Sequence, residues 1–188
     1  MKLMDALSAR RAVRDFRPDP VDKDVLTELC QAATLAPSYM NLQPWQFAVV
    51  ADPATVAELG RKAKRHLLPQ LDRSPLFAQQ RAEISAPSFE IFYNAPALIV
   101  ICAGDDNPLN AIGCAMAAHS LMLAAQTMGL GSCFVSHALP WLESREGREA
   151  LGLSAGQHPI APIIIGCPAA EPLSPGRFAP RIHWVTHG

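Results

Sequence analysis

The stretch Ala36–Val50, APSYMNLQPWQFAVV, combines three local signals. Pro37 ends a helix, because proline cannot donate a backbone hydrogen bond and disfavours helical geometry in the residue before it. The loop Tyr39–Gln43 follows and carries two side-chain amides. The apolar run Phe47–Val50 is then short enough to be a buried strand. The stretch therefore predicts a helix, an amide-bearing loop and a strand in succession.

The two amides of this loop belong to Asn41 and Gln43. Each offers hydrogen-bond donors and an acceptor, so the pair can recognise the edge of a flat polar heterocycle, where donors and acceptors alternate. On spacing alone, an ordinary helix-to-strand connection is the better interpretation. A functional interpretation therefore needs support from elsewhere in the chain.

A second polar cluster lies near the N-terminus, in residues 10–17, RRAVRDFR. It holds four arginines and one aspartate. A helix is expected before it, over Lys2–Arg11, and Pro18 and Pro20 after it force an extended exit. Guanidinium groups this close repel one another unless an anion lies between them. The segment therefore indicates either an anion site or a solvated basic surface.

Length and composition limit the class of protein. The chain has 188 residues, of which 49% are apolar, and a formal net charge of -1. This fits a single domain over residues 1–188, with a C-terminal extension over about 169–188. The low net charge argues against a nucleic-acid partner.

The cysteines and the N-terminus indicate a cytoplasmic protein. Five cysteines are scattered without a CxxC pair, which is typical of reduced core thiols. The first residues, MKLMDALSARR, carry charges where a signal peptide needs its apolar stretch. No uninterrupted apolar run reaches the length that a membrane span requires, so we expect no membrane partner.

Hydrophobic runs and capping signals predict the remaining elements. Three apolar runs fit buried strands: residues 96–102, 132–136 and 160–167. Asp52-Pro53 and Asn107-Pro108 each pair a capping side chain with a proline at the first helical position, so a helix follows each. Asp22 is expected to cap the helix that ends before Pro37.

The helix expected over Ile112–Met128 has only four polar residues before Gly129 ends it. Such a helix must be buried on every side, and in a chain this short a partner subunit can provide part of the cover. Another helix, after Pro53, ends in four basic residues: Arg61, Lys62, Lys64 and Arg65. They complement the helix dipole, and binding the extra phosphate of NADPH is the weaker alternative.

Two segments are harder to assign. His66–Phe92 contains three prolines and mixed signals, and we interpret it as a partly helical excursion that could cover a site. The tail from Ala169 is rich in proline and ends in the apolar run Ile182–Val185. It either frays or lies as an extended arm on another surface, which we expect to be the other subunit.

No motif for another common chemistry is complete. Gly129–Phe134, GLGSCF, starts like the dinucleotide fingerprint but lacks the third glycine and follows a helix instead of a strand. Walker, HExxH, GxSxG and zinc-type CxxC patterns are missing from the sequence. Cys114 with His119, and Cys133 with His137, could ligate a metal. Such pairs more often belong to the core, so we expect no metal site.

The two long motifs together resemble the flavin-dependent nitroreductase family, in its compact form. Residues 10–16, RRAVRDF, are similar to the family's RR-S-x-R-x-F start. Residues 36–45, APSYMNLQPW, are similar to its APS-x-x-N-x-QPW segment. The apolar runs and the GLGSC segment follow in the family's order. The resemblance covers most of the chain, except residues 66–92 and the tail.

The resemblance implies an α+β protein with a central mixed β-sheet flanked by helices, assembled as an intertwined homodimer with FMN at the interface. It implies an oxidoreductase that takes hydride from NADH or NADPH. Small electrophilic acceptors, such as nitroaromatics or quinones, then receive the hydride in a ping-pong cycle. The flavin carries this chemistry, so no catalytic side chain is expected.

The same resemblance implies the cofactor-binding residues. The residues that match the family's contacts to the FMN phosphate and ribityl chain are Arg10, Arg11, Ala12 and Arg14. Those that match the loop from the partner subunit are Pro37, Ser38, Tyr39, Asn41 and Gln43. Those that match the strand end beside the flavin ring are Phe134, Val135 and Ser136. Arg177 matches a basic residue that reaches the phosphate from the tail.

Two positions depart from the family's pattern. Ala12 replaces the usual serine, so only its backbone N–H can serve there, and Tyr39 replaces a small residue, where it can narrow the pocket or stack over it. Two alternative functions remain. One is a specialised flavin dehydrogenase or dehalogenase on the same scaffold, and the other is a flavin-binding protein for storage or sensing without turnover.

Overall fold

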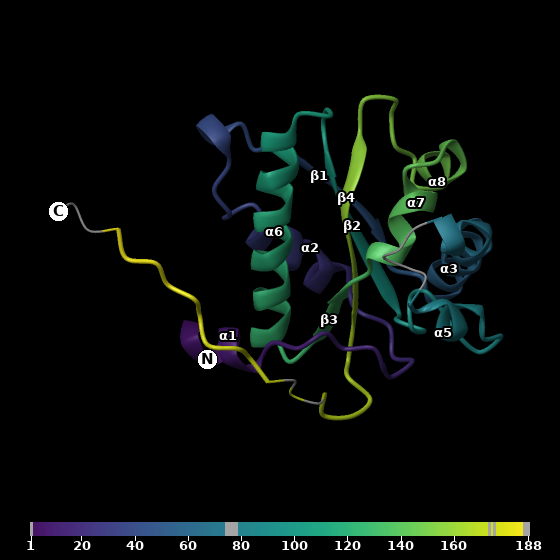
Figure 1. The fold of residues 1–188 in the computed structure, drawn as a ribbon, viewed down its shortest axis with the longest axis horizontal. Helices are drawn as coiled ribbons and strands as arrows, with labels where there is room; N and C mark the ends of the chain where they lie inside the picture. Colours follow the sequence, from purple (N-terminus) through teal and green to yellow (C-terminus); the bar gives the residue numbers. More distant parts are fainter. Residues whose placement is uncertain (1, 74–78, 173, 175, 186–188) are drawn as a thin grey trace.

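The computed structural model describes residues 2–73, 79–172, 174 and 176–185, and Figure 1 shows the arrangement of the chain. Its helices are α1 (Leu3–Ala9), α2 (Lys23–Ala33), α3 (Pro53–Leu67), α5 (Arg81–Ser85), α6 (Pro108–Thr127), α7 (Leu139–Leu142) and α8 (Arg145–Ala150). Short 3-10 turns are η1 (Tyr39–Asn41), η2 (Leu68–Arg73) and η3 (Ser136–Ala138). The strands are β1 (Trp45–Val50), β2 (Ala97–Ala103), β3 (Gly131–Phe134) and β4 (His158–Gly166).

The four strands form one sheet in the order β1-β2-β4-β3, and each neighbouring pair is antiparallel. The predicted α+β class, with a central sheet flanked by helices, is confirmed. The prediction of a mixed sheet was wrong, because the neighbouring strands are all antiparallel. Strands β2 and β3 are joined through α6, a connection that usually makes parallel neighbours. Because β4 lies between them, both pair with β4 instead. A parallel pairing does occur as an isolated bridge between Ala12 and Ser132.

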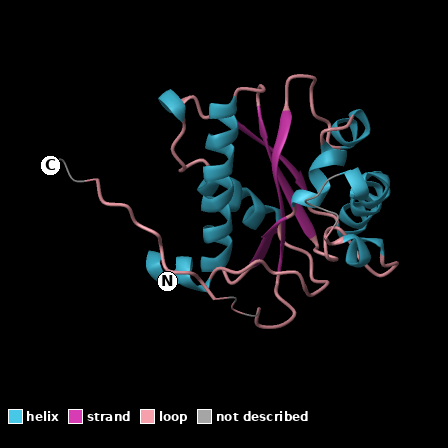
Figure 2. Cartoon of the chain, viewed as in Figure 1, coloured by secondary structure: helices cyan, strands magenta, loops and turns pink. Residues whose placement is uncertain are grey.

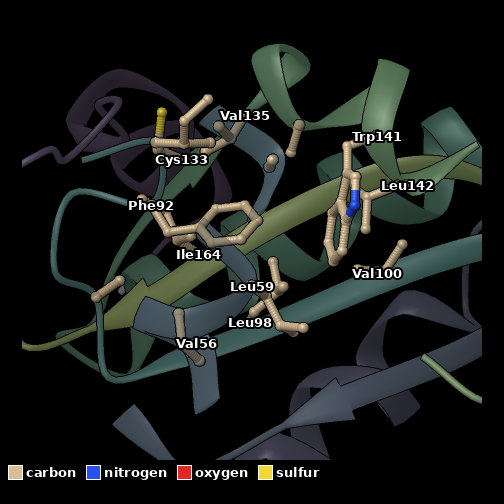
Figure 3. Close-up of a cluster of buried hydrophobic side chains, with 14 of the residues drawn as sticks. Val56, Leu59, Phe92, Leu98, Val100, Cys133, Val135, Trp141, Leu142 and Ile164 are labelled. Carbon is tan, nitrogen blue, oxygen red and sulfur yellow. The ribbon is translucent and has the colours of Figure 1, made fainter. Parts of the chain in front are cut away.

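Helices cover both faces of the sheet, with α2 and α6 on one face and α3, α7 and α8 on the other (Figure 2). Strand β2 is buried along its whole length, so its residues alternate between two apolar cores. Leu98 and Val100 point into the core under α3 and α7, where Trp141 and Phe92 are the largest side chains (Figure 3). Ile99 and its neighbours pack against α2 and α6 on the opposite face.

The predicted helix ends are found at three positions. The Asp52 carboxylate accepts a hydrogen bond from the Thr55 amide at 2.8 Å, with Pro53 at the first helical position. Asn107 caps α6 in the same way, and Gly129 ends it with a φ of 75°. Asp22 lies at the N-cap of α2, but its side chain makes no capping hydrogen bond within the described structure.

Helix α6 is buried on one side only within this chain. Leu109, Ile112 and Met116 lie exposed at helical spacing, and the Ile112 side chain is 55% exposed. Burial on every side was predicted with a partner subunit as part of the cover, and within one chain the helix leaves these three apolar residues facing outward. By length and composition, α6 is the one helix in the described part of the chain that could span a membrane. Its other side packs against α2 and the sheet, which is typical of a core helix.

Residues 10–17, called the arginine segment from here on, lie across one end of the sheet. The Val13 amide donates to the Ser132 carbonyl at 3.1 Å, and the Arg17 amide donates to the Cys167 carbonyl at 2.9 Å. Val13 is buried and Arg14 is exposed, because successive side chains of an extended segment point to opposite sides. The backbone pairing therefore directs Arg14 away from the core.

Gly131 allows this close approach. A Cβ atom built on Gly131 would lie 2.8 Å from the Cβ of Val13, closer than two carbon atoms can pack. Gly131 is therefore needed for the packing of Val13. The sequence of the GLGSCF stretch only argued against a dinucleotide-binding role and did not predict this contact.

The tail leaves the sheet after Pro168 and has no helix or strand in its described residues. The side chains of Ile182, Trp184 and Val185 are largely exposed. The end of the tail is therefore extended and does not pack into the core of its own chain, whereas Ser174, nearer the sheet, contacts the N-terminal segment.

We predict that Gly131→Ala destabilises the protein by about 1–3 kcal/mol, because the added methyl group must displace Val13. Urea unfolding followed by tryptophan fluorescence measures the change. Gly176→Ala is the matched control, since a Cβ atom there meets no neighbour within 4 Å. Equal stability of the two variants would contradict the packing role of Gly131.

Candidate functional site

A cavity of about 610 Å³ opens where β3 ends. Three parts of the chain form it: the arginine segment, the segment before β2, and the strand end with the turn that follows. Its described lining residues are Arg14, Gln79, Gln80, Glu83, Tyr93, Cys133, Phe134, Val135, Ser136 and His137. The cavity therefore brings together Arg14 and the three predicted residues of the strand end.

A second cavity, of about 720 Å³, adjoins the first through Arg14, which lines both. Its other walls are the backbone around Ala12 and residues of the tail, among them Glu171 and Ser174. Arg14 therefore lies between two cavities, and their combined volume is larger than that of a single aromatic ring. This arrangement suits an elongated anionic ligand.

The positive charge of the arginine segment reaches the first cavity. The Arg14 guanidinium lies 5.8 Å above the centre of the Tyr93 ring, a cation–π contact. Burial raises the pKa of the Cys133 thiol, and the charges of Arg14 and Arg10 act in the opposite direction. Burial also raises the pKa of the Tyr93 hydroxyl, and Arg14 again opposes the change. Arg10 and Arg14 thus favour negative charge in this cavity.

Arg11 and Arg177 lie apart from the first cavity. The Arg11 guanidinium donates to the Ser174 hydroxyl at 2.7 Å and to the Arg10 carbonyl at 2.9 Å. Arg11 and Arg177 line a smaller cavity of about 330 Å³ on the side of the tail. The structure therefore separates the predicted basic residues into two groups.

The predicted loop residues lie at the other end of α6. A Cβ atom on Gly113, near the start of α6, would lie 3.5 Å from the Ser38 side chain. The arginine segment instead pairs with Ser132, beyond the C-terminal end of this helix. Figure 1 shows η1 beside one end of α6 and α1 beside the other. About 20 Å of helix separates the two groups, so one chain does not bring Pro37, Ser38, Tyr39, Asn41 and Gln43 to the cavity.

The loop itself is held in an unusual backbone conformation. Met40, Asn41 and Gln43 have φ values of 45°, 54° and 48°, in the left-handed region that non-glycine residues rarely adopt. The Ser38 hydroxyl accepts a hydrogen bond from the Gln43 amide at 2.9 Å, which fixes the turn. Each such residue costs about 1–3 kcal/mol, and strain of this kind clusters at functional sites.

The first cavity also contains residues that the motifs did not predict. Nε2 of His137 lies 2.8 Å from Oε1 of Gln80, which joins the strand end to the segment before β2. Burial lowers the pKa of His137, and Glu83 acts against this change. The sequence indicated only that residues 66–92 could cover a site, and the described part of that range does line the cavity. Cys133 and His137, considered above as a metal pair, both lie in its wall.

The structure is a three-layer α+β fold with a cavity at the end of its sheet. Residues 7–167 match the model of the Nitroreductase family, and the chain belongs to that family. Proteins of this family are oxidoreductases. The resemblance of the two sequence motifs is thereby confirmed.

Known proteins similar to this chain have several activities. A 5,6-dimethylbenzimidazole synthase from Rhodospirillum rubrum is 33% identical in an alignment 187 positions long, gaps included, that covers 89% of this chain and 83% of that protein. An NADH dehydrogenase from Thermus thermophilus is 46% identical over 66 residues, covering 34% of this chain and 32% of that protein. The crystal structure of a nitroreductase with bound FMN from Bacteroides fragilis superposes with a TM-score of 0.83 and 22% identity. The superposition covers 99% of this chain and all of that one.

We predict that the pKa of His137 lies below its usual value of about 6.5 and falls further in Glu83→Gln. The Glu83 carboxylate favours the imidazolium, so its removal stabilises the neutral ring. The pH dependence of the His137 Cε1–H resonance measures this change. Glu149→Gln, which removes the exposed ion pair with Arg145, is the control, and we expect it to leave the midpoint of the His137 titration unchanged. A raised or unchanged midpoint in Glu83→Gln would refute the assignment.

Proposed function

We propose that this protein binds FMN and uses NADH or NADPH to reduce nitroaromatic, quinone or related electrophilic acceptors. The observation that carries the proposal is the meeting of Arg14 and the strand end Phe134–Ser136 on one cavity. FMN supplies reversible hydride transfer when it is bound. The protein then has to hold the cofactor, orient the acceptor and exclude water.

Arg10 and Arg14 are proposed to hold the FMN phosphate. A guanidinium group can donate two parallel hydrogen bonds to phosphate oxygens, and charge-assisted bonds are the stronger ones. Their combined effect on Cys133 supports a site that favours an anion. Arg11 and Arg177 approach from the tail side, where they can contribute to the phosphate only from the adjoining space.

The strand end is proposed to lie beside the flavin ring. The Phe134 side chain is 42% exposed and lines the cavity, so it offers an apolar surface there. The Val135 amide already donates to the Pro162 carbonyl at 2.9 Å, so this amide supports the sheet and does not serve the ring. Tyr93 and His137 form a polar wall that can orient an acceptor.

A second copy of the chain is proposed to complete each site. Residues 37–43 lie about 20 Å from the arginine segment of their own chain, so they can reach a cavity of this kind only in a partner. The exposed stripe of Leu109, Ile112 and Met116 on α6 supports a homodimer. The exposed side chains of Ile182 and Trp184 fit an arm that lies on the partner.

A biosynthetic flavin enzyme is the second candidate. The observation in its favour is the 33% identity with a 5,6-dimethylbenzimidazole synthase over most of both chains. The name of the Thermus relative supports NADH as a donor instead. Steady-state oxidation of NADH with an added quinone separates the two candidates, because only the proposed reductase turns over with these two substrates.

The five cysteines, all free in the structure, support a cytoplasmic location.

We predict that Arg10→Ala and Arg14→Ala each weaken FMN binding about tenfold or more, because a charge-assisted hydrogen bond contributes about 1.5–3 kcal/mol. A flavin-fluorescence titration measures both affinities. Riboflavin lacks the phosphate and should bind wild type and variants equally. Arg17→Ala is the matched control, since Arg17 is on the same segment but pairs with Asp19 at 2.7 Å. Unchanged FMN affinity, or an equal loss for riboflavin, would falsify the phosphate assignment.

We predict a homodimer that Ile112→Asp disrupts, because the substitution places a carboxylate in the apolar stripe of α6. Sedimentation velocity at micromolar concentration measures the assembly. Glu58→Gln, on the exposed side of α3, is the control and retains the dimer. A folded wild-type monomer at this concentration would contradict the proposal.

A further inference from the structure

Lys64 of α3 anchors the segment that forms one wall of the cavity. Its ammonium group donates hydrogen bonds to the carbonyls of Ala86 and Phe89, both at 2.7 Å. It also lies 5.8 Å above the centre of the Phe89 ring. Lys64 is half-buried, and its side chain makes three contacts with this segment: two carbonyls and one aromatic ring.

Phe89 carries the effect of Lys64 into the cavity. Its ring packs edge-on against Tyr93, with centres 5.7 Å apart, and against His137, with centres 6.5 Å apart. Both of these residues line the cavity, whereas Lys64 is not among the described lining residues. An aromatic pair of this geometry is stabilising beyond its buried area. Phe89 therefore links Lys64 to two rings of the cavity wall.

Ile84, Ile91 and Phe92 fix this wall to the core, but the part of the wall between Ile84 and Ile91 has little regular structure. Helix α5 spans Arg81–Ser85 only, and helices this short are not stable alone. Tyr93 and Asn94 have φ values of 50° and 55°, so the chain enters β2 through a strained turn. Such a conformation persists only where the surrounding contacts enforce it: Ile91 and Phe92 are buried in the core beside the turn, and Phe89, held by Lys64, packs against Tyr93 itself.

We propose that Lys64 is a positioning residue: through Phe89 it holds Tyr93 and His137 in the cavity wall and thereby determines which acceptors the cavity admits. The first part of this proposal concerns the chain alone. The second part, on acceptors, rests on the proposed function. Lys64 thus has a role different from that of its neighbour Lys62, which pairs with Glu58 at 3.0 Å on the surface.

The first test compares Lys64→Met with Lys62→Met in the protein without added cofactor, by NMR titration of the His137 Cε1–H resonance. Loss of the anchor lets water reach the imidazole, so the pKa of His137 rises towards its usual value in Lys64→Met only. Loss of a nearby positive charge acts in the same direction, but salt screens that effect. The rise is therefore expected to persist at high salt. No rise, a rise that salt abolishes, or an equal rise in Lys62→Met overturns the positioning role.

The second test measures kcat and KM with NADH and two acceptors, a small benzoquinone and a bulky naphthoquinone. In Lys64→Met we expect KM for the acceptors to rise about tenfold and the preference between them to change, with a smaller effect on kcat. Lys64→Arg, which retains a cation that can donate to both carbonyls, restores the preference. An unchanged preference in Lys64→Met overturns the part of the proposal that concerns acceptors.

The two tests separate this proposal from the proposed function. If wild type does not oxidise NADH with either quinone, the proposed function fails, and the NMR titration still decides the positioning role. Thermal unfolding of each variant identifies a general loss of structure. If Lys64→Arg and Lys64→Met change the His137 titration equally at wild-type stability, the hydrogen bonds to the two carbonyls do not carry the effect, and the anchoring proposal is overturned.

Discussion

The structure depends on the close contact between the arginine segment and the end of the sheet. Gly131 leaves room for the Val13 side chain, and the backbone hydrogen bond from Val13 to Ser132 fixes the register of the segment. With Val13 directed into the core, the next side chain, Arg14, must point outward, because neighbouring side chains in an extended segment alternate. A packing constraint of the core thus places a charged group at the edge of the cavity.

Helix α6 then separates the two groups of proposed cofactor-binding residues. It connects β2 to β3 across the sheet, so its length is fixed by the fold. The strained loop around Asn41 packs near its start, and the cavity with Arg14 lies beyond its end. A rigid helix cannot bring these groups together within one chain, and its exposed apolar stripe provides a surface on which a second chain can.

Local signals in the sequence predicted most elements, because a cap such as Asp52 or a terminating Gly129 acts on adjacent residues. The family motifs also predicted Arg14 and the strand end as parts of one site. The antiparallel sheet was not predicted, since the insertion of β4 depends on long-range pairing. Tyr93 was missed, and Lys64 and His137 were assigned other roles, for the same reason: these residues come together only after the segment before β2 folds over the cavity, and no local signal predicts that.

The central claim is that each cofactor site takes its arginines from one chain and its amide loop from another. The most direct measurement is the amount of tightly bound FMN after Arg14→Ala and Asn41→Ala chains are unfolded together and refolded as a mixture. Each variant alone should bind FMN weakly. Random pairing should then create one intact site in every mixed dimer, so about a quarter of all sites recover wild-type affinity. A mixture that binds no better than the two separate variants would contradict the claim.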